Sequence, residues 1–198
     1  MLAYTTARSG KKRNRYLRRL LLGLLVLFAA MAQNVPWLPA FFGVRALLLL
    51  PLVVSIAVLE QEVPAICFGA LAGLLWDVSA QDPRGWHALF LTVIAFICAM
   101  LMRYLFNCNL LTVGLLGFAA AALYLFARWA LDSLVPGVGL DFEALLRFYL
   151  PRLVYTMALL PLCYWLVRAV VRKTSRRQVG EHIKEEGNIG QIRAAERE

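Results

Sequence analysis

Six apolar runs, each bounded by charged or turn-forming residues, constrain most strongly what this chain can fold into. They are Leu20–Phe42, Ala46–Leu59, Val63–Trp76, Trp86–Met102, Leu110–Leu131 and Leu150–Val171. Of the 198 residues 61% are hydrophobic and 17% charged, and the mean hydropathy is +0.67. A water-soluble domain of this size could not bury so much apolar surface. The sequence therefore predicts an all-α polytopic membrane protein.

Two of these runs are short for a membrane span. Ala46–Leu59 and Val63–Trp76 have fourteen residues each, which makes about 21 Å of helix against a hydrocarbon core of about 30 Å. Either the two runs form a re-entrant hairpin, or each helix extends to its charged ends and places these near the interfaces: Arg45, Glu60, Glu62 and Asp77. We expect the second arrangement, which gives six transmembrane helices; the hairpin would give four.

Basic residues flank the apolar region. Residues 1–19 hold seven Lys or Arg and no acid, and residues 172–198 hold seven Lys or Arg and five Glu. Because cytoplasmic flanks of spans are enriched in positive charge, both termini are expected in the cytoplasm, which requires an even number of spans. This reading explains the net charge of +9 without a nucleic-acid partner.

Three parts follow from this distribution: a basic cytoplasmic arm (1–19), a six-span domain (20–171) and a charged, flexible cytoplasmic tail (172–198). The arm is expected to lie on the membrane surface through its cations, which anionic lipid attracts. They are Lys11, Lys12, Arg13, Arg15, Arg18 and Arg19. As an alternative, the basic start, the apolar run and Ala30-Met31-Ala32 are similar to a cleaved signal peptide.

Small residues recur at a helical spacing in the third run. Ala65, Gly69, Gly73 and Asp77 are four residues apart and so share one helix face. Residues without bulky side chains let a neighbouring helix approach closely, and GxxxG is the usual form of this surface. A carboxylate on that face should meet protein, since a charge is costly in lipid. We expect Asp77 to pair with Arg45, Arg128 or Arg152, and the stripe to pack against a helix of this chain or of a partner.

No pattern in the sequence predicts catalysis, a cofactor or a metal. It has no GxSxG, HExxH or P-loop motif. The two histidines are too few for a histidine metal cluster, and the four cysteines have no regular spacing. Asp77, Ser79, Asp82 and His87 are close in sequence, but closeness alone does not indicate a catalytic site.

The segment Gly69-x3-Gly73-Leu-Leu-x-Asp77, with Gly85 and Ala88-Leu89 after it, resembles the rod-shape-determining protein MreD family of bacteria. The resemblance implies a non-enzymatic scaffold for lateral peptidoglycan synthesis, in the elongation machinery (elongasome) of the inner membrane. Its implied partners are a bitopic MreC-like protein, the actin-like MreB, RodA and a class B penicillin-binding protein. It also implies helix packing at Ala65, Gly69, Gly73, Asp77 and Gly85, and a fold similar to the substrate-binding subunits of energy-coupling-factor transporters.

That similarity supplies an alternative function. A six-helix binding subunit of a vitamin importer would have much the same composition. It would need a solvent-reachable pocket with convergent polar groups. The predicted spans offer few polar side chains, which favours the scaffold.

Overall fold

The structure, a computed structural model, describes residues 2–34, 47–81, 85–104, 110–134 and 149–195. Side chains are described within 14–34, 47–81, 85–104, 111–131 and 149–174. Every regular element in these residues is a helix: α1 (Leu2–Asn34), α2 (Leu49–Leu59), α3 (Glu62–Ala80), α4 (Trp86–Tyr104), α5 (Leu110–Leu134) and α7 (Leu150–Ala195). The all-α prediction is confirmed for this part of the chain.

Polar contacts at the helix ends fix the direction of each neighbouring pair. The Leu49 backbone N–H, at the start of α2, donates to Oε1 of Gln33 at the end of α1 (3.0 Å). At the other end of α2, Glu60 meets Arg18, at the middle of α1 and about four turns before Gln33. Arg103, near the end of α4, meets Glu62 at the start of α3. Thus α2 runs antiparallel to α1, and α4 antiparallel to α3.

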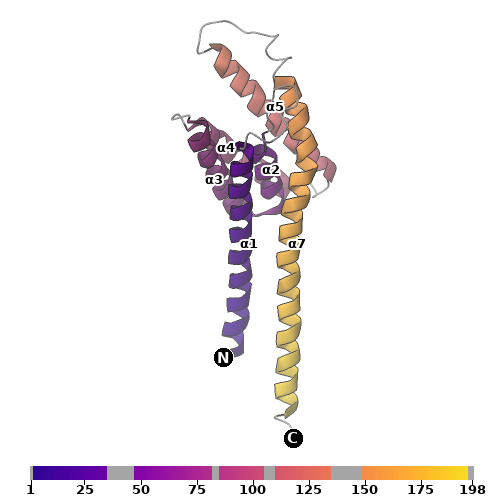
Figure 1. Ribbon diagram of the computed structural model, residues 1–198. Coiled ribbons are helices and arrows are strands. Elements are labelled where there is room, and N and C mark those ends of the chain that lie inside the picture. The colour runs from indigo at the N-terminus through magenta and orange to yellow at the C-terminus, as the bar shows by residue number, and fades with distance from the viewer. Residues whose placement is uncertain (1, 35–46, 82–84, 105–109, 135–148, 196–198) are drawn as a thin grey trace.

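The two chain ends lie on the same side of the molecule. Figure 1 shows α1 and α7 extending side by side from the bundle, with N and C at neighbouring ends. Helix α1 begins at Leu2, and α7 is one helix of 46 residues from Leu150 to Ala195. Each therefore continues through the limits predicted for the arm and the tail. The division into three parts stays a prediction.

Helix α2 is the centre of the bundle. Every residue from Leu49 to Val58 is buried, and α2 contacts α1, α3, α4, α5 and α7. Its composition is apolar all round, as expected for a helix without a solvent-facing side. Its one hydroxyl, that of Ser55, donates to the carbonyl of Pro51 (2.7 Å), so it is satisfied within the helix.

Five of the described helices are long and apolar enough to cross a membrane. They contain the segments Asn14–Asn34, Glu62–Ala80, Trp86–Tyr104, Leu111–Leu131 and Leu150–Thr174. Helix α2 has 11 residues, about 16 Å of helix. The run predicted as the second span is therefore a short buried helix over the residues that the structure describes, and the count of six spans stays a prediction.

Candidate functional site

The small-residue stripe of α3 packs against α4. These two helices contact each other more extensively than any other described pair. A Cβ added at Gly69 would lie 2.8 Å from the Leu91 carbonyl oxygen and 2.8 Å from the Ala95 Cβ. At Gly73 it would overlap the Cα of Ala88. Glycine is therefore required at both positions, because the α4 backbone occupies the space of a side chain.

One helical turn beyond Gly73, Asp77 binds the first turn of α4. The backbone N–H of His87 donates to Oδ1 (3.1 Å), and that of Ala88 donates to Oδ2 (2.9 Å). The Nδ1 atom of His87 lies 2.7 Å from Oδ1. These N–H groups have no partner within α4, since the first turn of a helix leaves its donors unsatisfied. Asp77 therefore caps α4 from α3.

Gly85 explains why the cap comes from another helix. It precedes α4 directly and has a φ of +64°, a left-handed conformation that favours glycine. Having no side chain, it cannot accept a hydrogen bond as Ser, Thr, Asn or Asp would in that place. The carboxylate of Asp77 fills this role, and its negative charge suits the positive end of the α4 dipole.

Aromatic rings surround the capped end. The rings of Trp76 and His87 stack with centroids 4.5 Å apart, and Tyr124 of α5 lies 5.4 Å from Trp76. Phe90 meets Tyr124 edge to face at 5.3 Å. Trp76, Asp77, His87 and Tyr124 are all buried. The carboxylate thus sits in a low-dielectric setting, which strengthens each of its hydrogen bonds.

The structure places the predicted site residues as follows. Ala65, Gly69, Gly73 and Asp77 are buried on one face of α3, and Gly85 stands at the start of α4. Each hydrogen bond given above for Asp77 leads to α4, not to an arginine. Arg45 lies outside the described residues. A pairing of Asp77 with Arg45, Arg128 or Arg152 stays a prediction.

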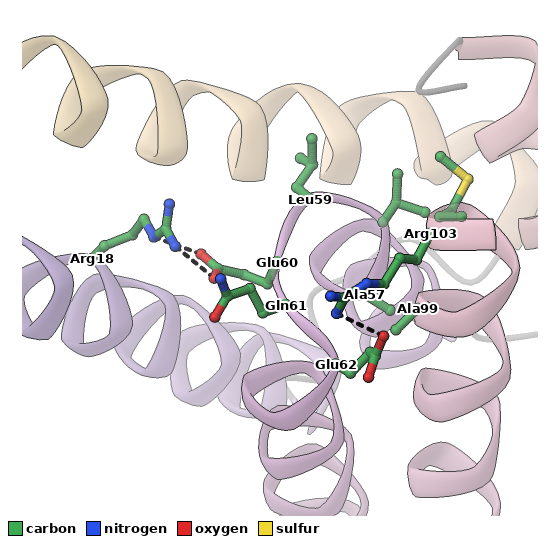
Figure 2. Close-up of a pocket in the computed structure, with 10 residues that line it drawn as sticks. Arg18, Ala57, Leu59, Glu60, Gln61, Glu62, Ala99 and Arg103 are labelled. Carbon is green, nitrogen blue, oxygen red and sulfur yellow. Dashed lines mark hydrogen bonds and ion pairs between the residues drawn. The ribbon is translucent and has the colours of Figure 1, made fainter. Parts of the chain in front are cut away.

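At the opposite end of α3, one ion pair links the end of α2 to α1 and another links the start of α3 to α4 (Figure 2). Nε of Arg18 lies 2.7 Å from Oε1 of Glu60, and its Nη2 donates to Oε2 (2.8 Å). Nη1 of Arg103 donates to Oε1 of Glu62 (2.8 Å). The Glu60 side chain is fully buried, whereas the Arg103 side chain is 61% exposed. Burial raises the pKa of Glu60 above its usual value, although Arg18 and Arg19 act in the opposite direction.

Arg18 was expected at the lipid surface, but in the structure its guanidinium pairs with Glu60. Arg15 and Arg19 are exposed. The side chains of Lys11, Lys12 and Arg13 lie outside the described ones, so the surface role of the arm stays a prediction. Among the described residues, no group of three or more His, Cys, Asp or Glu could hold a metal ion.

Two features of the site were missed by sequence reasoning. His87 was considered only as a catalytic candidate, yet its ring lies beside Asp77. The sequence signal for the cap was Gly85, directly before the helix, with an acid eight residues earlier. The pairing of Arg18 with Glu60 joins residues 42 positions apart. The spacing of apolar residues along a helix gives no information about a contact between residues so far apart in the sequence.

A comparison with protein families decides the identity of this bundle. The family model described as rod shape-determining protein MreD matches residues 14–174. The chain belongs to the MreD family. Searches of curated proteins and of solved structures gave no match.

Membership in the MreD family connects the chain with the determination of rod shape. The matched region begins at the first candidate span and ends with the last, Leu150–Thr174. Together with the apolar helices, it identifies a multi-pass membrane protein. MreD is a family of structural, shape-determining proteins and not a known enzyme family. The resemblance to the MreD family noted in the sequence is confirmed. The residues that carry it lie where α3 packs against α4.

Proposed function

We propose that this chain is an integral-membrane scaffold of the machinery that synthesises lateral peptidoglycan in bacteria. In this role it binds a bitopic MreC-like protein and links it to MreB, RodA and a class B penicillin-binding protein. The observation that carries the proposal is the family match over residues 14–174. No step of this role requires a reaction at the chain itself.

The packing of the stripe bears on where a partner binds. Because α4 fills the space beside Gly69 and Gly73, the partner helix uses a different surface. Apolar side chains remain exposed on α1, at Leu20, Leu24 and Phe28, and on α5. In a membrane these faces are available to lipid and to a single partner helix, whose association depends on close packing.

The helix directions support six passes through the inner membrane, with both termini in the cytoplasm. Helix α2 runs antiparallel to α1, from the Gln33 side toward the Arg18 side, and it covers about 16 Å of that path. Helices buried inside a bundle need no lipid-facing length. The basic residues near both ends of the chain favour a cytoplasmic location for that side. Similarity to the energy-coupling-factor subunits remains part of this proposal.

Depletion of the protein in a rod-shaped host tests the function. We expect cells to become round while vitamin uptake is unchanged, and the bitopic partner to co-purify with the wild-type chain in detergent. Normal shape together with a specific uptake defect would overturn the scaffold and favour the alternative, a small-molecule binding subunit.

Reporter fusions test the topology. Fusions at residues 1 and 198 should both report the cytoplasm, and a tag at Gly137 should report the outside. A C-terminal reporter outside the cell would contradict six passes. Loss of an N-terminal tag from the mature protein would instead favour cleavage after Ala32.

A further inference from the structure

A cavity of about 410 Å³ opens where α1, the α2–α3 corner and α4 meet. Its polar lining consists of Arg18, Glu60, Gln61, Glu62 and Arg103 (Figure 2). Its apolar lining consists of Ala57, Val58, Leu59, Ala99 and Met102. The volume falls within the usual range for sites that bind small molecules.

The cavity stands at the ends of the candidate spans. Glu62 is the first residue of the α3 span, and Arg103 is next to the last residue of the α4 span. Arg18 lies in the first turns of the α1 span. Side chains at this level of a membrane protein meet the polar headgroups of lipids, and the apolar lining continues toward the hydrocarbon region.

The two ion pairs that line the cavity differ in how easily they open. Arg18 and Glu60 make two contacts with each other, and the carboxylate is fully buried. Separating them would strand a buried charge, which is costly. Arg103 and Glu62 meet through a single guanidinium nitrogen, and their side chains are 61% and 26% exposed. An exposed pair of this kind contributes little, so a ligand can replace it at small cost.

We propose that the cavity binds the headgroup of a phospholipid that carries both a phosphate and a primary ammonium, such as phosphatidylethanolamine. The headgroup separates Arg103 from Glu62. Its phosphate accepts hydrogen bonds from the Arg103 guanidinium, and its ammonium donates to the Glu62 carboxylate. One exposed ion pair is thereby replaced by two charge-assisted contacts, and no charge is left without a partner. The glycerol and the first part of the acyl chains lie against Ala57, Ala99 and Met102.

The charge balance of the lining selects this class of ligand. Two guanidinium groups of the lining face two carboxylates, so the lining residues together carry no net charge, and Arg19 acts on Glu60 from outside the lining. A headgroup without a cation, such as that of phosphatidylglycerol, would bind Arg103 through its phosphate and offer Glu62 only neutral hydroxyl donors, which bind a carboxylate more weakly than an ammonium does. A choline headgroup has a cation without N–H groups, so it could not donate to Glu62. The structure therefore predicts a preference for ethanolamine over both glycerol and choline headgroups.

Native mass spectrometry of the full-length chain in detergent tests the proposal. Phosphatidylethanolamine, phosphatidylcholine and phosphatidylglycerol of identical acyl chains are added one at a time. We expect one ethanolamine lipid to be retained about tenfold more strongly than either other lipid, which corresponds to about 1.4 kcal/mol. Equal retention of the three lipids, or stronger retention of phosphatidylglycerol, would overturn the proposal.

Variants locate the binding. Arg103→Gln and Glu62→Gln should each abolish the preference, and the exchanged pair Glu62→Arg with Arg103→Glu should restore it, since both charges are again present. Arg172→Gln removes an exposed arginine of α7 that does not line the cavity, and it should retain the preference. Loss of the preference in Arg172→Gln, or its survival in both single variants, would contradict the site.

A soluble competitor separates the lipid from its free headgroup and needs no variant. Millimolar glycerophosphoethanolamine should leave the bound lipid in place, because it lacks the acyl chains that contact the apolar lining. Full displacement at that concentration would show a site for a soluble phosphate ester and would overturn the lipid assignment. None of these measurements depends on cell shape, so their result is separate from that of the depletion experiment.

Discussion

Carboxylates at the two ends of α3 find their partners in different ways. At its C-terminal end, Asp77 accepts hydrogen bonds from two backbone N–H groups of α4, and the imidazole of His87 lies against it. At its N-terminal end, Glu60 and Glu62 meet the guanidinium groups of Arg18 and Arg103. One end thus binds a helix terminus, and the other binds long, flexible cations.

The difference follows from how closely the helices approach. Near Asp77, glycine brings the backbones of α3 and α4 into contact, so a short carboxylate reaches the first turn of α4 directly. Near Glu62, the helix ends are separated enough to leave a cavity, and only long side chains cross it. The Asp77 end is therefore rigid, and the Glu62 end can exchange its partners.

The largest effect is expected from adding a side chain at Gly73, where α3 packs directly against the α4 backbone. Gly73→Ala places a methyl group on the backbone of Ala88, and the helices must separate. We expect a loss of about 3 kcal/mol or more in stability, seen as a large fall in the amount of folded protein and in partner co-purification. Gly73→Leu should be more severe.

Gly114→Ala is the matched control for that change. A Cβ at Gly114 meets nothing within 4 Å among the described atoms. Since alanine favours a helix over glycine, this variant should be neutral or more stable by up to about 1 kcal/mol. Equal melting temperatures of Gly73→Ala and Gly114→Ala would show that the close contact between α3 and α4 at Gly73 does not limit stability.

Removing the cap comes next. Asp77→Ala removes the acceptor of the buried His87 N–H and of the partly buried Ala88 N–H, and should cost about 1–3 kcal/mol. Asp77→Asn keeps one accepting oxygen and should lose about half as much. The melting temperature in detergent measures both. If Asn costs as much as Ala, the charge of Asp77 matters more than the cap, as a pairing with Arg128 or Arg152 would require. Asp82→Ala, outside the described residues, is predicted to be mild.

The ion pair between Arg18 and Glu60 should respond to mutation differently from the Asp77 cap. Removing one of its partners should destabilise the protein, whereas removing both should restore most of the stability. Arg18→Met leaves the fully buried Glu60 carboxylate without this partner and should cost about 2 kcal/mol. The double variant Arg18→Met with Glu60→Leu removes both charges and should recover most of the loss. A double variant as unstable as Arg18→Met alone would mean that the ion pair itself stabilises the corner.

The smallest effect concerns pH. Because burial raises the pKa of Glu60 in the folded state, the folded form retains its proton to a higher pH than the unfolded form. The contribution of Glu60 to stability therefore falls as pH rises from about 4.5 through the folded pKa. The melting temperature of wild type should decline relative to Glu60→Gln over this window. A relative rise would contradict the direction of the shift.

Sequence reasoning predicted the helical class and the close-packed stripe, because both depend on local periodicity. It predicted the limits of α2, α3, α4 and α5 to within a few residues, but not the start of α1 at Leu2 or the end of α7 at Ala195, which lie in polar segments outside the apolar runs. It also placed Asp77 in protein rather than in lipid. It did not find the partners on α4, since the choice between an arginine and a helix terminus depends on the distance between two backbones. The same holds for Arg18 and Glu60, whose contact depends on how α1 and α2 are aligned.

The shortest helix also bears on the order in which the protein can be made. Helix α2 is synthesised second, yet it is surrounded by helices made later, and α7, the last one, is its most extensive neighbour. Leu47, just before α2, donates to the hydroxyl of Thr156 in α7 (3.4 Å). The last of the helices that enclose α2 therefore leaves the ribosome only at the end of translation. Chains that stop before α7 would expose α2 to lipid along one side, where a membrane protease could recognise them as unfinished.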